Sequence, residues 1–93
     1  MADKLTEDEI ETRLNRTDGW QREGDTIVRK LTFPSFMEAI AFIDRIAELA
    51  DEADHHPEIF NVYDRVTLTL TTHDAGGLTN RDFDLADAIN GVI

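Results

Sequence analysis

The three histidines of the chain fall within one short stretch, and they are the residues best suited to chemistry near neutral pH. His55 and His56 precede Pro57, and His73 follows a threonine-rich segment. An imidazole has an ordinary pKa of about 6.5, so it can give or take a proton at physiological pH. Carboxylates flank all three histidines in the sequence. The pattern therefore predicts a site for general acid–base chemistry.

The same cluster is also compatible with a metal site, because catalytic zinc often has three protein ligands. The chain contains no cysteine, which excludes a disulfide, a thiolate nucleophile and a cysteine-based zinc or iron–sulfur site. Zinc held by histidines and carboxylates stays open on composition alone.

The chain is strongly acidic, with 20 Asp and Glu residues against 9 Lys and Arg residues and a formal net charge of −11 at pH 7. Nucleic acid is bound chiefly through Lys and Arg contacts to phosphates, so we expect no nucleic-acid partner. The acids are spread along the sequence from Asp3 to Asp87. This spread indicates a strongly hydrated surface suited to a halophilic cytoplasm, with an ordinary acidic protein as the alternative.

The length of 93 residues predicts a single domain over residues 1–93. A domain of this size buries only about 60–65% of the surface that its unfolded chain exposes, so self-association would add stability. Residues 1–6 lack the apolar core of a signal peptide, and no run approaches the ~20 apolar residues of a membrane span. We therefore expect a cytoplasmic protein with no membrane partner.

Capping signals and periodicity predict the first half of the fold. Thr6 and Glu9 form a capping box ahead of a helix predicted over residues 7–14. A hairpin is predicted next, with a turn at residues 23–25 and a strand, rich in β-branched and apolar residues, over residues 26–33.

A long apolar helix is predicted from a second capping box, formed by Ser35 and Glu38, to about residue 53. Its apolar face suggests packing on a sheet and on a partner subunit. The predicted stripe on that face contains Phe36, Ile40, Ile43, Ala47 and Ala50, widened by Met37, Ile46 and Leu49.

Two further strands are predicted after the histidine pair, over residues 59–63 and 66–73, with a tight turn at Asp64-Arg65. The second strand alternates, because side chains on a strand point to opposite faces in turn. His73 is thereby predicted on the polar face at the end of the strand. The apolar face contains Val66, Leu68, Leu70 and Thr72, and the polar face Thr67, Thr69, Thr71 and His73.

A last helix is predicted from Thr79 and Asp82, which form a capping box with Asp in place of Glu, to about Ile89. The resulting order is α-β-β-α-β-β-α. Strands in hairpin pairs with helices between them predict an α+β two-layer fold, a four-stranded antiparallel sheet with helices on one face.

Several short motifs stand at fixed spacing around the histidines. Residues 54–58 read DHHPE, residues 61–63 read NVY and residues 72–79 read THDAGGLT. Asp82 and the Leu85-Ala86 pair follow. Together these motifs closely resemble the pterin-4a-carbinolamine dehydratases, and the resemblance extends over nearly the whole chain.

The resemblance implies a hydro-lyase, a 4a-hydroxytetrahydrobiopterin dehydratase. Its substrate would be a 4a-hydroxytetrahydropterin, the carbinolamine left when an aromatic amino-acid hydroxylase has used its tetrahydropterin. Water leaves, and a quinonoid dihydropterin remains for recycling. The lone pair of the neighbouring N5 can expel the hydroxyl group, so an acid and a base suffice. The resemblance thus implies no metal and no cofactor.

The resemblance also implies roles for individual residues. His55, His56 and His73 would be the catalytic histidines, with His55 and His73 as acid and base in either order and His56 orienting the pterin. Asp51, where relatives usually carry glutamate, and Trp20, in the core or in the pocket wall, would support the site. The substrate-contact positions would be Asp54, His55, His56, Thr71, Thr72, His73 and Asp74.

Partners follow from the same resemblance. We expect a small-molecule pterin substrate, a homo-oligomer (dimer or tetramer), and an aromatic amino-acid hydroxylase as a partner in the pathway. In animals the family also serves as a dimerisation cofactor for a homeodomain transcription factor. A non-enzymatic binding or regulatory module is therefore one alternative, and a role on a molybdenum-cofactor pterin is another.

Overall fold

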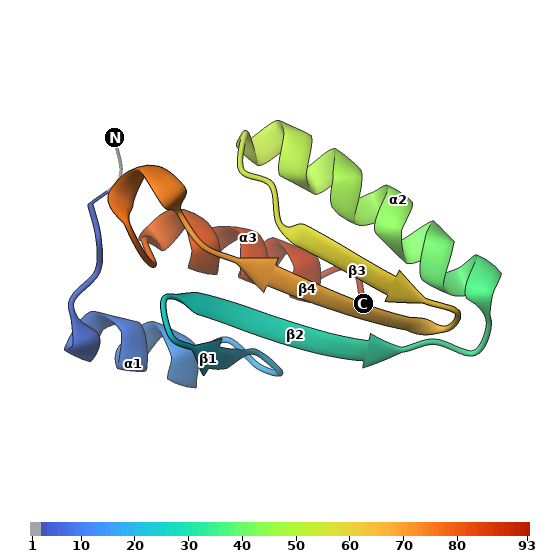
Figure 1. The fold of residues 1–93 in the computed structure, drawn as a ribbon, viewed down its shortest axis with the longest axis horizontal. Coiled ribbons are helices and arrows are strands. Elements are labelled where there is room, and N and C mark those ends of the chain that lie inside the picture. Colours follow the sequence, from blue (N-terminus) through green and yellow to red (C-terminus); the bar gives the residue numbers. More distant parts are fainter. Residues whose placement is uncertain (1–2) are drawn as a thin grey trace.

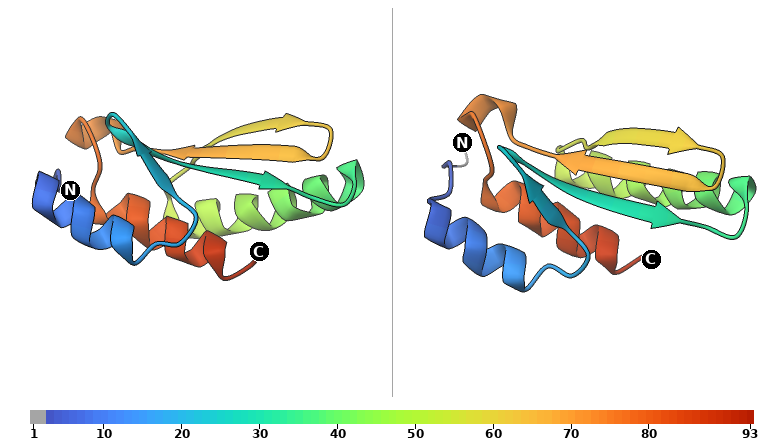
Figure 2. Two further views of the ribbon diagram at one scale, coloured as in Figure 1. Left: turned by 90° about the horizontal axis from the view of Figure 1, so that it is seen from below. Right: turned by 60° about the horizontal axis from the view of Figure 1, so that its bottom comes forward.

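Four antiparallel strands form one sheet, and three helices cover a single face of it, in the computed structural model, which describes residues 3–93 (Figures 1 and 2). The elements follow the order α1-β1-β2-α2-β3-β4-α3, and the strands lie in the order β1-β2-β4-β3. The predicted α+β two-layer fold is confirmed. Within residues 3–93, the other face of the sheet carries no α-helix (Figure 2).

The first helix begins where its cap predicts. Helix α1 spans Glu7–Asn15, and both hydrogen bonds of the Thr6/Glu9 capping box are present. Strand β1 (Gln21–Glu23) and strand β2 (Thr26–Thr32) then form the predicted hairpin. Local hydrogen bonding to the first turn of a helix decides its start, which is why the sequence predicts this boundary well.

Helix α2 spans Phe36–Ala53, but the face that it buries differs from the prediction. Phe36 and Met37 are exposed. Because α2 is apolar around much of its circumference, two neighbouring rows of residues fit a helical period, and periodicity does not separate them. The Ser35 hydroxyl accepts from Glu38 N–H as predicted. The buried row is Ala39, Phe42, Ile46 and Ala50.

The second hairpin turns one residue earlier than predicted. Strands β3 (Glu58–Val62) and β4 (Arg65–Leu70) pair from Val62 opposite Arg65, so Tyr63 and Asp64 form the turn. Tyr63 has a φ of 53°. The Asn61 side-chain amide donates to the carbonyls of Tyr63 and Arg65 at 3.1 and 2.9 Å. Hydrogen bonds from the Asn61 side chain, rather than a turn glycine, thus stabilise this turn.

Strand β4 ends at Leu70, three residues before the predicted end at His73. Its two neighbours account for this end, because β3 begins at Glu58, opposite Thr69, and β2 has only Thr26 beyond the Ile27–Leu70 pair. The chain then turns, and His73 opens a short 3₁₀ helix, η1 (His73–Ala75). The predicted alternation of β4 is confirmed.

Helix α3 spans Asn80–Asn90, with Thr79 and Asp82 making both bonds of the predicted capping box. The core lies between the sheet and the helices. Among residues 3–93, no helix combines the length and the apolar composition needed to cross a membrane. The largest fully buried apolar side chains are Phe42, Phe83, Ile27, Ile46, Leu68, Leu70, Leu78, Ile89 and Val66.

Candidate active site

The end of α2 directs the two neighbouring histidines into different surroundings. Asp54 adopts the left-handed conformation with a φ of 50°, which aspartate tolerates better than most residues. Pro57 disfavours helical backbone at His56. The chain reverses between these residues. His55 is 8% exposed, whereas the side chain of His56 is 61% exposed.

His55 is held by a buried carboxylate. Its Nε2 lies 2.5 Å from Oδ1 of Asp82, which is fully buried. The other oxygen of Asp82, Oδ2, accepts from the hydroxyl of Thr72 at 2.8 Å and from the N–H of Thr79 at 2.9 Å. The two threonine hydroxyls lie 2.8 Å apart. A buried carboxylate is costly unless it is hydrogen-bonded, and both oxygens of Asp82 are.

His56 makes a different kind of contact. Its Nε2 lies 2.9 Å from Oδ1 of Asp51, which is in the last turn of α2. Both side chains are exposed, and exposed ion pairs contribute only about 0–1 kcal/mol to stability. The contact therefore sets the orientation of the His56 ring more than it stabilises the fold.

The loop after β4 brings the third histidine to the same place. Thr72 N–H donates to Gly77 C=O at 3.1 Å, which closes a short loop. Gly76 has a φ of 75°, a conformation that favours glycine. His73, the first residue of this loop, is exposed. The histidine predicted at a strand end thus lies on a tight loop beyond it.

A polar cavity of about 270 Å³ joins these segments. It is lined by every residue predicted above to contact the substrate, and also by Arg81, which was not predicted. The structure therefore brings together residues that are up to 27 positions apart, because α3 packs its first turn against the end of α2. The lining residues are Asp54, His55, His56, Thr71, Thr72, His73, Asp74 and Arg81.

Two residues of this site were missed as functional residues by sequence reasoning. Arg81 donates from Nη2 to the carbonyl of Asp54 at 2.5 Å, and no motif signals this contact. Asp82 was predicted as a helix cap and as part of the family motif, with no role in the site, although it is also the partner of His55. Its signal in the sequence was the choice of Asp over Glu in this capping box.

Trp20, predicted as a supporting residue, belongs to the core. It is 5% exposed and is absent from the residues that line the cavity. Its Nε1 donates to Oδ1 of Asn90 at 2.9 Å, at the end of α3. Of the two positions predicted for Trp20, the core and the pocket wall, the structure supports the core.

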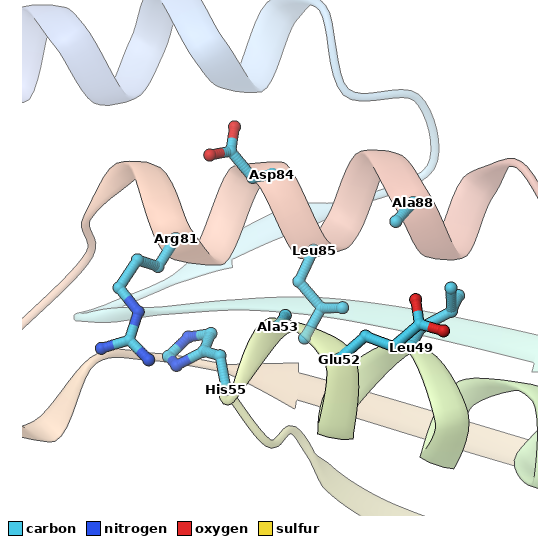
Figure 3. Close-up of a pocket in the computed structure, with 8 residues that line it drawn as sticks. All are labelled: Leu49, Glu52, Ala53, His55, Arg81, Asp84, Leu85 and Ala88. Carbon is cyan, nitrogen blue, oxygen red and sulfur yellow. The ribbon is translucent and has the colours of Figure 1, made fainter.

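A second hollow of about 350 Å³ runs between α2 and α3 (Figure 3). Leu49 and Leu85 supply apolar surface, and Glu52 and Asp84 supply carboxylates. His55 and Arg81 stand at one end of this hollow and also line the histidine cavity. Among residues 3–93, no group of three His, Cys, Asp or Glu side chains is arranged to hold a metal ion.

Known proteins are similar to this chain in sequence and in fold. A sequence model of the family described as "Pterin 4 alpha carbinolamine dehydratase" matches residues 3–92. A relative from Roseiflexus sp. (strain RS-1), which carries the provisional name pterin-4-alpha-carbinolamine dehydratase, is 50% identical over 93 residues and covers 100% of both chains. A relative with the same name from Picosynechococcus sp. is 49% identical, covering 92% of this chain and 94% of its own.

Solved structures agree. The crystal structure of a transcriptional coactivator/pterin dehydratase from Brucella melitensis superposes with a TM-score of 0.93 at 39% identity, covering 97% of this chain and 98% of the other. A pterin dehydratase-like protein described as a RuBisCO assembly factor in the alpha-carboxysome has a TM-score of 0.64 at 23% identity, over 78% of this chain and 84% of its own. The second likeness concerns the fold alone.

The fold and the site define a small α+β domain that gathers three histidines from two segments into one polar cavity. The family match spans nearly the whole chain, and relatives of about half identity cover it end to end. The chain belongs to the pterin-4-alpha-carbinolamine dehydratase family. The resemblance predicted from the motifs is confirmed.

Proposed function

We propose that this protein dehydrates a 4a-hydroxytetrahydropterin to the quinonoid dihydropterin. The observation that carries the proposal is the convergence of His55, His56 and His73 on one cavity. These are the three side chains of the chain best suited to moving protons near pH 7. The family to which the chain belongs is named for this reaction.

The contacts of each histidine support a division of roles. We assign the acid and the base to His55 and His73, in either order, and the orientation of the pterin to His56. Nε2 of His55 is engaged by Asp82, which leaves Nδ1 to exchange a proton. His73 is exposed on its loop and accessible to a substrate. His56 is already oriented by Asp51 at 2.9 Å.

The reaction requires one bond to break and one proton to move in each direction. The N5 lone pair of the pterin forms a carbon–nitrogen double bond as the bond between C4a and the hydroxyl oxygen breaks. The acid gives its proton to the departing hydroxyl, which leaves as water, and the base takes a proton from a ring nitrogen. Each positioned proton transfer contributes typically about 10²–10⁴-fold to the rate.

Stopped-flow absorbance on freshly generated carbinolamine tests this function. Water loss with the wild-type protein should exceed the rate in buffer, and His73→Ala should lower kcat by about 10²-fold or more. Asn15→Ala, at the exposed end of α1, serves as a control that should leave kcat unchanged. A wild-type rate equal to the buffer rate would overturn the proposal, as would a His73→Ala variant as fast as wild type.

We place the reaction in tetrahydropterin recycling, with an aromatic amino-acid hydroxylase as the source of the carbinolamine. Addition of the protein to a hydroxylase assay should then prolong turnover of limiting tetrahydropterin. Calorimetry supplies the comparison with the molybdenum-cofactor pterin, since the recycling role requires tighter binding of the tetrahydropterin-derived ligand. A preference for the other pterin would contradict this role.

We further propose that two copies of the chain pair through β3. This strand lies at the edge of the sheet and has β4 as its neighbour on one side. Phe60 and Tyr63 are each 66% exposed, and Ile59 and Val62 are 40% and 41% exposed. Natural edge strands usually carry Lys, Pro or a bulge that prevents pairing, and β3 carries no Lys or Pro. A second β3 supplies the complementary unpaired backbone about a two-fold axis.

Light scattering after gel filtration tests this interface. Phe60→Lys should shift the dimer or tetramer toward smaller species, because a charge on the edge strand opposes pairing. Met37→Lys is the matched control, since Met37 is 70% exposed on α2. Dissociation by Met37→Lys alone would show that α2, and not β3, forms the contact.

A further inference from the structure

Asp82 lies at the centre of a buried hydrogen-bonded network that joins three segments of the chain. Oδ1 contacts Nε2 of His55, in the connection between α2 and β3. Oδ2 contacts the hydroxyl of Thr72, the residue before His73. The same oxygen accepts the N–H of Thr79, at the start of α3. One fully buried carboxylate thus contacts the ring of one histidine and the segment that carries another.

We propose that Asp82 is a positioning residue that holds His55 in the tautomer with its proton on Nε2, and that holds the His73 segment through Thr72. The role in catalysis rests on the proposed function. An ionised carboxylate only accepts hydrogen bonds. Its partners must therefore donate, and for His55 this places the proton on Nε2 and the lone pair on Nδ1.

The backbone N–H of Thr79 makes this assignment testable. It lies 2.9 Å from Oδ2 of Asp82 and can only donate. In Asp82→Asn, the amide oxygen must therefore face Thr79, because the alternative places two donors against each other. The amide NH₂ then faces Nε2 of His55 and requires a lone pair there. The substitution should move the proton of His55 from Nε2 to Nδ1.

The tautomer is directly measurable by ¹⁵N NMR of the imidazoles, without substrate. Wild type should show a protonated Nε2 on His55 under conditions where the ring is neutral, and Asp82→Asn a protonated Nδ1. In the dehydratase assay, the same variant should lose about 10²-fold or more in kcat with a smaller change in KM, since the substitution alters the proton-transferring group. The pH profile of kcat should change with it.

Glu9→Gln is the matched control. Glu9 occupies the corresponding third position of the capping box of α1 and is exposed there. The control thus makes the same carboxylate-to-amide change in the same kind of helix cap, outside the cavity. It should leave the three imidazole spectra and kcat as in wild type, which separates a carboxylate-to-amide change in a helix cap from loss of the His55 partner.

Thr72→Val tests the second half of the network and keeps the proposal testable should Asp82→Asn fail to fold. Valine has a similar volume but cannot donate to Oδ2. The proton of His55 should stay on Nε2, because Asp82 still accepts it, while the His73 resonances shift and kcat falls. Thr72→Ser, which restores the hydroxyl, should recover both.

The two readouts distinguish the possible failures. An unchanged His55 tautomer in Asp82→Asn, or a protonated Nδ1 in wild type, would overturn the positioning role whatever the activity. Thr72→Val with unchanged His73 resonances and kcat would overturn the link to the His73 segment. The expected tautomers in a chain with no dehydratase activity would overturn the proposed reaction and leave the structural role of Asp82 supported.

Discussion

The guanidinium of Arg81 donates a hydrogen bond of 2.5 Å from Nη2 to the main-chain carbonyl of Asp54. Asp54 is the left-handed residue at which α2 ends, and His55 follows it. Arg81 also precedes Asp82, the partner of the His55 ring. The first turn of α3 therefore contacts both the backbone before His55 and its imidazole, which explains how a cavity can be built on a short connection.

Arg81→Gln should lower kcat/KM about tenfold, equivalent to about 1.4 kcal/mol. The substitution removes a charge-assisted hydrogen bond to Asp54, and such bonds are the stronger ones. Arg81→Lys should recover only part of the loss, because an ammonium group lacks the planar geometry of guanidinium. Steady-state kinetics with Arg45→Gln, an exposed arginine of α2, as the control checks this. Equal effects at both arginines would contradict a role in the site.

Asp51→Asn should raise KM a few-fold and leave kcat nearly unchanged. Asp51 contacts His56 at 2.9 Å, and both side chains are exposed, so the pair contributes under about 1 kcal/mol. We expect the loss in binding because His56 is assigned to orienting the pterin. Asp44→Asn, at an exposed position of the same helix, should change neither constant. A hundredfold fall in kcat at constant KM would instead place Asp51 in the chemical step.

Trp20→Phe should reduce the free energy of unfolding by about 1–2 kcal/mol and change kcat/KM less than twofold. It removes a buried donor to Asn90 together with part of a core side chain. Urea unfolding and the dehydratase assay measure the two effects. Tyr63→Phe, at an exposed aromatic residue, is the control. Loss of activity at full stability would return Trp20 to the pocket wall.

The predictions from sequence that hold are those that depend on neighbours along the chain. Helices α1 and α3 start where the capping residues Thr6 and Thr79 predict, because a cap satisfies N–H groups in the first turn of its own helix. The alternation of β4 correctly placed Leu68 and Leu70 in the core. The motifs identified the family and seven of the eight residues that line the cavity, all but Arg81.

The features that escaped prediction depend on other elements. The end of β4 depends on where its two neighbours, β2 and β3, begin, and the sequence of β4 does not contain this information. The buried row of α2 follows from the position of the sheet, because two apolar rows fit equally well. Asp82 contacts a histidine 27 residues away, so only the packing of α3 on α2 reveals its second role.

The stability of the protein should fall as the pH drops below about 4.5. The hydrogen bond from Thr6 N–H lowers the pKa of Glu9, and the hydrogen bond with Arg22 lowers the pKa of Glu7. Each folded-state pKa lies below the unfolded value of 4.5. The stability from each carboxylate is therefore fully present above that value and is lost as the pH falls through the folded-state pKa.

Urea unfolding across this acidic range measures the effect. Glu9→Gln keeps an oxygen that can cap the helix but removes the titration, so its unfolding free energy should fall less steeply below pH 4.5 than that of wild type. Glu48→Gln, which removes an exposed carboxyl from α2, provides the comparison. Parallel curves for wild type and Glu9→Gln would show that the cap does not contribute to acid unfolding.

Molar KCl should stabilise the folded chain relative to low salt. With 20 acidic and 9 basic side chains, the net charge is −11, so most acids lack a cation with which to pair. Repulsion among them falls as the Debye length shrinks from about 10 Å at 0.1 M to about 3 Å at 1 M. Salt also weakens attractive pairs such as that between Arg22 and Glu7, but those pairs are fewer than the unpaired acids.

The urea-unfolding free energy in 0.1, 1 and 3 M KCl, where the Debye length is about 10, 3 and 2 Å, measures this effect. A double variant, Asp44→Asn with Glu48→Gln, should show a smaller salt effect, because both exposed acids lie on α2. A free energy that is flat or falls with salt would contradict adaptation of this surface to a high-salt cytoplasm.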